Sequence, residues 1–266
     1  MIAALLVTGA TTINNVSRLR DVDIMRRLLQ HLGVTVTENR RRLLIDTSAV
    51  TTMEASYDLV RMMRASVLVL GPLLACYGRA KVSLPGGCAI GQRPIDLHLA
   101  ALQELGAEIN LRRGYVFVST KRLRGATITF DKVTVTGTEN VMMAATLAKG
   151  VTIIRNAARE PEVCDLASML RKMGAVIEGD GTDTITIEGR EALAPASHTP
   201  ISDRIEAATL MAAAVATHGD VTLSNTDPDH FTAVINKLEQ AGARVTVVGQ
   251  ASLRIRFDGR PRPVDI

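Results

Sequence analysis

Apolar side chains return every three to four residues along several stretches of this chain, with polar positions between them. Ile24, Leu28 and Leu32 lie four residues apart, and the stretch 166–174 has the same spacing. An α-helix turns once in about 3.6 residues, so such a run places its apolar side chains on one face. The spacing therefore predicts amphipathic helices, each with one buried stripe that faces a sheet.

Strand-like runs separate these helices. β-branched residues dominate two of them, VTIIRNA at 151–157 and DVTLSNT at 220–226. Apolar and polar positions alternate in two others, DTITIEG at 183–189 and SLRIRFDG at 252–259. β-branched side chains pack well on a pleated sheet, and alternation places every second side chain on the same face. The sequence is therefore predicted to form a mixed α/β fold.

Helices and strands follow one another in a fixed order that occurs four times, which indicates a repeat architecture. Each copy runs helix, strand, helix, strand, strand, with a further strand leading in. The glycines that close the second helix of each copy are Gly33, Gly106, Gly174 and Gly242, which are 73, 68 and 68 residues apart. The glycines expected in a left-handed conformation after the first helix are Gly9, Gly78, Gly150 and Gly219. Three copies around a shared axis would bury their helices inside and leave their sheets outside.

The two ends of the chain depart from this pattern. Only eight residues precede Gly9 in the first copy, whereas about fifteen precede the matching glycine in the other three. Residues 259–266, GRPRPVDI, resemble the start of a fifth copy. We therefore expect the chain to begin inside a helix and to end within a further unit.

Composition and charge narrow the classes of ligand. Hydrophobic residues make up 47% of the 266 positions, but Trp is absent and there are only three Tyr and four Phe. Proteins that bind single-stranded nucleic acids use aromatic stacking platforms, so this composition argues against a nucleic-acid partner. The formal net charge is +4, and the densest basic run, at 40–42, is predicted to be a solvated turn between two strands. Small anionic ligands suit this balance better.

Cysteine usage and hydropathy indicate a soluble, cytoplasmic protein. Cys76, Cys88 and Cys164 cannot all pair, so reduced thiols are the simpler interpretation. The start of the chain lacks a charged region and a full apolar segment, so it does not match a secretion signal. The longest apolar stretch, 67–76, is far shorter than the ~18 residues that a membrane-spanning helix needs. No membrane partner is expected.

One glycine-rich stretch, LPGGCAIGQRP at 84–94, carries candidate chemistry. The glycines around Cys88 permit a mobile lid, and a free thiol with a pKa near ~8.5 can exchange a proton at neutral pH. The alternative is a small buried cysteine, which is how Cys76 and Cys164 are interpreted. Arg93 is biased toward an extended conformation by the proline after it, and its guanidinium fork suits a phosphate or a carboxylate.

Three further polar positions lie near predicted helix starts. Arg64 stands where an apolar helix begins, and a cation there is favourable only if an anion binds nearby. Asp96 is either a ligand contact or only the N-cap of the helix that follows it. His98 either lies near the site or, in the preferred interpretation, is a histidine on the surface of that helix.

Taken together, these motifs resemble the UDP-N-acetylglucosamine enolpyruvyl transferase family. The segments that carry the resemblance are MRAS at 63–66, SLPGGCAIGQRPIDLHL at 83–99, DKVTVTGTENVMMAATLA at 131–148, NAAREPEV at 156–163 and SDRIEAAT at 202–209. The resemblance implies an inside-out α/β barrel of β-α-β-α-β-β units, with six units in two domains. By this resemblance the chain holds four of them. Residues 1–201 would form a three-repeat domain with a truncated first repeat, and 202–266 one repeat of the second domain.

The resemblance also implies an activity. Such enzymes transfer the enolpyruvyl group of phosphoenolpyruvate to the 3-hydroxyl of UDP-N-acetylglucosamine and release phosphate, in the first committed step of peptidoglycan synthesis. No cofactor and no metal are implied. The family's Lys-Asn pair and its general base are expected outside this chain, so little turnover is expected of the chain alone. Losing a positioned base removes ~10²–10⁴ in rate.

Other interpretations of the resemblance stay open. One is a non-catalytic UDP-sugar-binding paralogue or fragment, and another is an enzyme assembled with a second chain. Transfer to a shikimate-type acceptor is a third, although the intact cysteine motif weighs against it. A second chain or self-association is expected to cover the incomplete second domain, because its helices would otherwise expose an apolar face.

The resemblance finally assigns roles to single residues. Cys88 is implied as the catalytic proton donor, which can also form a covalent adduct with phosphoenolpyruvate. The implied substrate-binding residues are Arg64, Arg93, Pro94, Ile95, Asp96, Leu97, Lys132, Val133, Thr134 and Val135. Among them, Arg93 is implied to contact phosphoenolpyruvate, Arg64 the UDP-sugar, and Lys132 the diphosphate.

Overall fold

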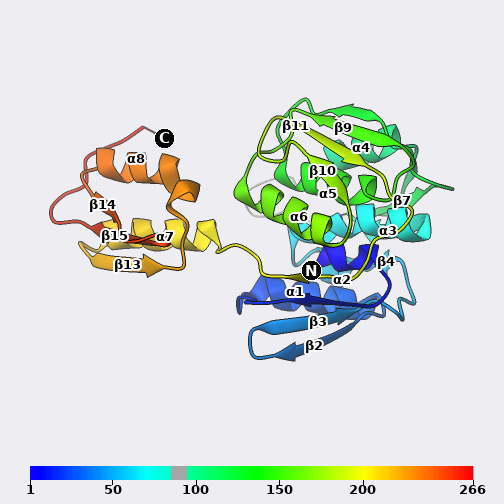
Figure 1. Cartoon of the computed structure of the whole chain (residues 1–266), viewed down its shortest axis with the longest axis horizontal. Coiled ribbons are helices and arrows are strands. Elements are labelled where there is room, and N and C mark those ends of the chain that lie inside the picture. Colours follow the sequence, from blue (N-terminus) through cyan, green and yellow to red (C-terminus); the bar gives the residue numbers. More distant parts are fainter. Residues whose placement is uncertain (85–94, 266) are drawn as a thin grey trace. The chain divides into compact units, whose positions relative to one another are not determined.

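The run of helices and strands expected from the sequence occurs three times in residues 1–200 and once more in 201–266 (Figure 1). The structure is a computed structural model, and it describes residues 1–84 and 95–265. It contains two units, Met1–Pro200 and Ile201–Ile266, each of which is compact by itself. The mixed α/β fold predicted from the sequence is confirmed.

Three copies of the run build the first unit. The first copy comprises η1 (Ile2–Leu6), β1 (Ala10–Ile13), α1 (Arg20–His31), β2 (Thr35–Asn39) and β3 (Arg42–Asp46). The second comprises β4 (Glu54–Ala55), α2 (Tyr57–Val60), η2 (Arg64–Val69), α3 (Leu70–Tyr77), β5 (Arg79–Ser83), α4 (Asp96–Glu104), β6 (Glu108–Arg112) and β7 (Tyr115–Ser119). The third comprises β8 (Thr127–Thr129), α5 (Val135–Ala145), β9 (Val151–Arg155), α6 (Pro161–Lys172), β10 (Val176–Glu178) and β11 (Thr184–Glu188), and β12 (Ser197–His198) follows it.

Each sheet of the first unit has four strands, and the order of the strands is the same in all three sheets. The orders are β12-β1-β3-β2, β4-β5-β7-β6 and β8-β9-β11-β10. The leading strand of each sheet is parallel to its neighbour, which confirms the predicted leading strand. In the first sheet this strand is β12, whose Ser197 pairs with Thr12 and His198 with Ile13. The last strand of the first unit, β12, therefore pairs with its first strand, β1.

Helices lie between the sheets of the first unit, and each sheet turns one face outward (Figure 1). The predicted stripe of α1 is buried at Ile24, Leu28 and Leu32. Along β11, Ile185 and Ile187 are buried while the alternate positions are not. Burying one large aliphatic side chain contributes about 1.5–3 kcal/mol. The apolar stripes of the sequence therefore form one continuous core between the helices and the inner faces of the sheets.

The glycines predicted to close the second helix of each copy do follow it, and all four have φ angles in the left-handed region. Their φ angles are 95° at Gly33, 89° at Gly106, 101° at Gly174 and 106° at Gly242. After the first helix the prediction holds for three copies and is wrong for the fourth, where His218 takes the positive φ of 54° and Gly219 does not. The left-handed residue thus lies one position earlier in the fourth copy.

The second unit repeats the run with one strand fewer. It comprises α7 (Arg204–Ala216), β13 (Asp220–Ser224), η3 (Pro228–Phe231), α8 (Thr232–Gln240), β14 (Arg244–Val247) and β15 (Ser252–Arg256). Its three strands are ordered β13-β15-β14. Met211, Phe231 and Leu253 are buried in its small core, whereas Ile205 and Leu210 of α7 are 60% and 47% exposed.

Two smaller features also bear on the sequence analysis. Arg40 and Arg41 form an exposed turn between β2 and β3, which confirms the solvated turn predicted at 40–42 for these two residues, whereas Arg42 is the exposed first residue of β3. Among the helices of the described residues, none has the length and apolar character needed to cross a membrane.

Candidate functional site

The cysteine motif lies between β5, which ends at Ser83, and α4, which begins at Asp96. Three of the predicted site residues, Cys88, Arg93 and Pro94, lie outside the described residues. Their roles therefore stay predictions. The site is built below from the predicted residues that the structure describes.

The start of α4 carries three of these residues. Ile95 occupies the N-cap position and Asp96 is the first residue of the helix, so the alternative interpretation of Asp96 as the N-cap is wrong. The Asp96 carboxylate is exposed in the first turn, where the helix dipole favours a negative charge. Ile95 is buried and Leu97 packs partly against the core. Asp96 is thus the one of the three that faces solvent.

Lys132 to Val135 lead into the start of α5. Lys132 and Val133 are exposed, Thr134 is the N-cap, and Val135 is the first helical residue. The hydroxyl of Thr134 accepts a hydrogen bond from the Gly137 amide over 3.1 Å, which explains why a hydroxyl side chain is needed here. The first N–H groups of a helix have no carbonyl partner within it. The start of α5 therefore offers N–H donors close in sequence to a lysine.

Arg64 begins η2, the short helix that continues into α3. The prediction that this arginine stands at the start of an apolar helix is confirmed, because Ser66 to Val69 are buried behind it. Its side chain is exposed. Arg64 and Asp96 are thus two exposed charges at the starts of two different helices.

His98 is buried, with an exposed fraction of 2%, so its interpretation as a surface histidine is wrong. Its Nδ1 lies 3.0 Å from the Asn140 side-chain nitrogen and its Nε2 lies 3.3 Å from the Thr136 hydroxyl. The Asn140 side-chain oxygen in turn accepts a hydrogen bond from the Gly71 amide over 2.8 Å. One chain of hydrogen bonds therefore links α3, α4 and α5 inside the core.

The pKa of His98 depends on its burial and on two charged residues of the predicted site. Burial is the main cause that lowers the pKa of His98 to about 4; the positive charge of Arg64 lowers it further and the negative charge of Asp96 raises it. η2, which begins at Arg64, and α4, which begins at Asp96, both pack against α5. His98 lies two positions after Asp96 in α4, and its Nε2 contacts Thr136 at the start of α5. The structure thus brings together the predicted site residues of three helices.

Thr136, Thr138 and Asn140 are polar residues that the sequence analysis did not select. Thr138 is buried; its hydroxyl donates to the Thr134 carbonyl over 2.8 Å and accepts from the Ala158 amide over 3.1 Å. Such residues are unusual in a buried helix unless they are hydrogen-bonded. The polar run TGTEN inside an apolar helix was therefore a usable sign of a buried hydrogen-bond network.

A second group of ionisable side chains lines a pocket of about 330 Å³, with Glu139, Asp165 and His198 among its lining residues. Burial raises the pKa of Glu139 to about 7, Glu162 and Glu160 add to the increase, and the amino group of Met1 opposes it. The His198 Nε2 lies 3.1 Å from an Asp165 carboxylate oxygen. This pocket includes none of the predicted site residues.

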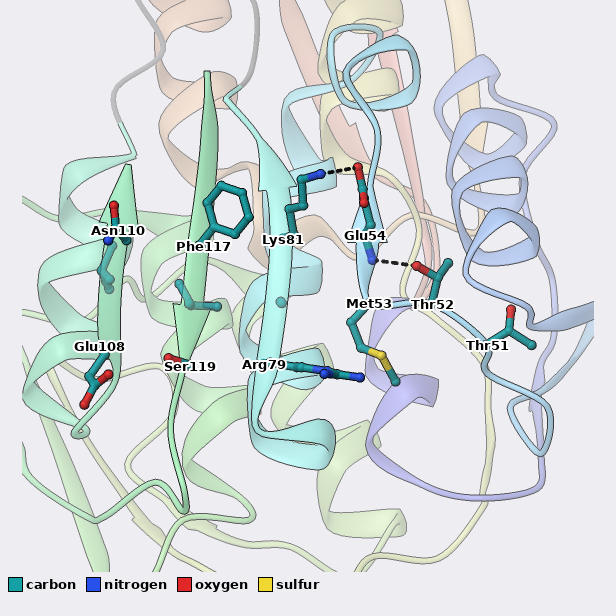
Figure 2. A pocket seen from close by; sticks show the side chains of 13 residues that line it. Thr51, Thr52, Met53, Glu54, Arg79, Lys81, Glu108, Asn110, Phe117 and Ser119 are labelled. Atoms are coloured by element: carbon teal, nitrogen blue, oxygen red, sulfur yellow. Dashed lines mark hydrogen bonds and ion pairs between the residues drawn. The ribbon is translucent and has the colours of Figure 1, made fainter. Parts of the chain in front are cut away.

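The pocket in Figure 2 lies on the outer face of the sheet β4-β5-β7-β6 and has a volume of about 730 Å³. Lys81 and Glu54 point toward one another across it and form an ion pair of 2.8 Å. The Lys81 ammonium also lies 4.6 Å from the centre of the Tyr115 ring. The ammonium is therefore already engaged, and the pocket contains none of the predicted site residues.

The two cysteines interpreted as core residues are not buried. Cys76 is exposed and Cys164 is half-buried. Cys76 is the seventh residue of α3, next to the end of the helix, and its thiol donates to the Leu5 carbonyl over 3.3 Å. Within the described residues, no three His, Cys, Asp or Glu side chains are grouped so that they could hold a metal ion.

Comparison with known protein families shows which family this chain belongs to. The model of the family described as EPSP synthase (3-phosphoshikimate 1-carboxyvinyltransferase) matches residues 1–266. The chain belongs to the EPSP synthase family. The name of that family refers to the transfer of a 1-carboxyvinyl group, which is also called an enolpyruvyl group.

Relatives within the EPSP synthase family are similar along this whole chain. A UDP-N-acetylglucosamine 1-carboxyvinyltransferase of Solibacter usitatus is 53% identical, over 99% of this chain and 63% of its own length. A protein of the same name from Anaeromyxobacter dehalogenans is 55% identical, over 99% of this chain and 64% of its own length. The resemblance noted in the sequence is therefore confirmed. The chain spans less than two thirds of the length of these curated relatives.

Solved structures of EPSP synthase family proteins share the fold. The enolpyruvyl transferase NikO from Streptomyces tendae matches with a TM-score of 0.82 and 23% identity, over 96% of this chain and 61% of that one. An EPSP synthase from Acinetobacter baumannii matches with a TM-score of 0.70 and 20% identity, over 97% of this chain and 62% of that one. At these identities the likeness concerns the fold alone.

Proposed function

We propose that this chain is the nucleotide-sugar-binding part of an enzyme that transfers the enolpyruvyl group of phosphoenolpyruvate to the 3-hydroxyl of UDP-N-acetylglucosamine and releases phosphate. The observation that carries the proposal is the packing of α4 and η2 against α5, with hydrogen bonds between His98 and α5 and with the cysteine motif directly before α4 in the sequence. The names of relatives at 53% and 55% identity support the choice of substrate.

The chemistry of these helix starts suits a nucleotide diphosphate. The first N–H groups of α5 and the ammonium of Lys132 are donors of the kind that bind phosphate oxygens. Arg64 adds a second cation, with a planar fork that can hold two oxygens at once. Asp96 is an acceptor, and it suits a sugar or ribose hydroxyl rather than a phosphate. The segment Ile95–Leu97 would border the same ligand.

Cys88 and Arg93 would supply the reacting end of the site. Transfer through a tetrahedral intermediate requires a proton on the methylene carbon of phosphoenolpyruvate, and a thiol can donate it at neutral pH. Arg93 would hold the phosphate or carboxylate of the same molecule. The partners proposed for the enzyme are these two substrates, and a second chain or a second copy is proposed to cover the exposed Ile205 and Leu210 of α7. Activity in the cytoplasm is proposed from Cys76 and Cys164, which are the free cysteines among the described residues.

Calorimetric titration of the chain with UDP-N-acetylglucosamine tests this proposal. We expect saturable binding that Lys132→Ala weakens about tenfold or more, because a charged hydrogen bond is worth about 1.5–3 kcal/mol. Lys81→Ala is the matched control, since Lys81 is a lysine of the same unit that lies on the outer face of a sheet. Absence of binding, or equal loss in both variants, would refute the proposed site.

A second measurement separates the enzyme from a non-catalytic binding protein. Phosphate release is followed with both substrates present, first for this chain alone. It is then followed for this chain mixed with an extract of cells that produce a polypeptide covering the part of the curated relatives that this chain does not match. Binding without release in both cases would favour the paralogue. Release in either case that Cys88→Ser abolishes would favour the transferase.

A further inference from the structure

The protonation of His98 can be deduced from the hydrogen bonds around it. A backbone N–H can only donate, so the Gly71 amide fixes the Asn140 side-chain oxygen as its acceptor over 2.8 Å. The Asn140 side-chain nitrogen is then the group that faces His98, and it too can only donate. The Nδ1 of His98 must therefore be the acceptor and carry no hydrogen.

The second nitrogen of the ring follows from the first. A neutral imidazole with no hydrogen on Nδ1 carries it on Nε2, which lies 3.3 Å from the Thr136 hydroxyl. His98 then donates to the oxygen of Thr136. A protonated imidazole would turn an N–H of His98 against the NH₂ of Asn140, so the network admits only the neutral ring. The Gly71 amide of α3 thus determines that His98 in α4 donates its Nε2 hydrogen to Thr136 in α5.

We propose that His98 is a positioning residue of the nucleotide-sugar site: its neutral imidazole, protonated on Nε2, fixes the hydroxyl of Thr136 and holds the starts of α4 and α5 in register. This inference rests on the proposed function. Thr136 is the second residue of α5 and immediately follows the predicted contacts Lys132 to Val135. Because its oxygen accepts from His98, its own hydrogen is left to be donated. Thr136 would therefore meet an oxygen acceptor of the bound ligand as a donor.

The arrangement also joins α4, the helix that follows the cysteine motif in the sequence, to the start of α5. His98 is the third residue of α4, the helix that directly follows residues 85–94, and the side chains of Thr136 and Asn140 both come from α5. A change at the start of α4 cannot move His98 without disturbing two hydrogen bonds to α5. His98 touches neither the ligand nor the reacting atoms in this proposal, and it acts through Thr136.

Two substitutions separate this role from simple packing. In His98→Gln the side-chain amide reaches the place of Nε2 and keeps a donor for Thr136. In His98→Asn the shorter side chain reaches only the place of Nδ1 and can keep an acceptor for Asn140. A purely structural role would be disturbed by both, whereas the positioning role requires the Gln variant to bind UDP-N-acetylglucosamine within about threefold of the parent and the Asn variant to bind about tenfold more weakly.

The test combines this titration with nitrogen-15 NMR of the imidazole in the unmodified 266-residue chain. We expect a hydrogen on Nε2 and none on Nδ1 at neutral pH, and retained thermal unfolding transitions in both variants. A hydrogen on Nδ1, equal weakening in both variants, or unchanged binding in the Asn variant would each overturn the positioning role while leaving the proposed function in place. Failure of the unmodified chain to bind the nucleotide sugar would overturn both, and the tautomer would still be read independently.

Discussion

The side-chain nitrogen of Asn140 lies 3.0 Å from Nδ1 of His98, and both residues are buried. This contact joins α4 to α5, and the Asn140 oxygen extends it to α3 through the Gly71 amide. A buried polar network is favourable only when each of its members has a partner, because an unpaired group keeps its full desolvation cost. The relation between these two residues therefore supports the fold and, in our proposal, the site.

Removing Asn140 should be costly to stability. Asn140→Leu would leave the Gly71 amide and Nδ1 of His98 without their partner, and each unpaired buried group costs about 1–3 kcal/mol. We expect the free energy of unfolding to fall by about 2–4 kcal/mol, measured by urea denaturation. Met142→Leu in the same helix is the control, because a volume-conserving change of a buried residue costs less than about 1.5 kcal/mol. Equal effects of the two changes would contradict the network.

Acid should weaken the fold through His98. Its pKa is about 4 in the folded chain and 6.5 as the ordinary value, so the unfolded chain takes up a proton that the folded chain refuses. The contribution is fully present above about pH 6.5 and is lost as the pH falls toward about 4, by about 3 kcal/mol in total. We expect His98→Gln to show a flatter acid limb when unfolding free energy is measured against pH. An acid limb as steep as that of the unmodified chain would show that His98 is not buried in its neutral form.

Glu139 should have the opposite dependence. Burial raises the pKa of its carboxyl to about 7 from 4.5, with Glu162 and Glu160 adding to the increase and the Met1 amino group opposing it. The unfolded chain then releases a proton that the folded chain retains, so stability is lost as the pH rises from about 4.5 through about 7.

We expect Glu139→Gln to be more stable than the unmodified chain above pH 7 by about 2 kcal/mol, allowing for partial solvent screening. The advantage should disappear near pH 4, where the carboxyl is protonated in both states. Thermal unfolding at the two pH values measures this. A constant difference between the proteins at both values would indicate a packing effect instead of a titration.

The cap of α5 offers a matched pair of changes. The Thr134 hydroxyl accepts from the Gly137 amide over 3.1 Å, so Thr134→Ala should lower the unfolding free energy by about 1 kcal/mol. Thr134→Ser keeps the oxygen and should stay within a few tenths of a kcal/mol of the unmodified chain. Amide exchange of α5 would report the loss locally. Equal exchange in the Ala and Ser variants would show that the cap contributes nothing.

Local patterns were sufficient for most of the fold and for part of the site. The stripe at Ile24, Leu28 and Leu32 identified a buried helix face, and the repeat predicted the run of helices and strands in each copy. His98 was misassigned although Ile95, three positions earlier, and Leu102, four later, are buried on the same face. The helical spacing of the apolar residues indicates that position 98 is buried, but the polarity of histidine was wrongly given more weight.

Other parts could not be read from local sequence. The partner of Asn140 is an amide 69 residues away, and such a pairing exists only once α3 and α5 are packed together. Whether Asp96 is the N-cap could not be decided, because the N-cap and the first residue of a helix differ by a single position, which local sequence does not fix. The left-handed residue of the fourth copy is His218, where glycine at the next position was the stronger local preference.

The most direct test of the central claim is a nitrogen-15 NMR titration of the full chain with UDP-N-acetylglucosamine. We predict saturable shifts of the Val135 and Thr136 amides, together with the residues around Arg64 and Asp96, because η2 and α4 both pack against α5. Amides of β5 and β7 near Lys81 and Phe117 should not move. Shifts confined to those strands, or no saturable shift at the start of α5, would contradict the account.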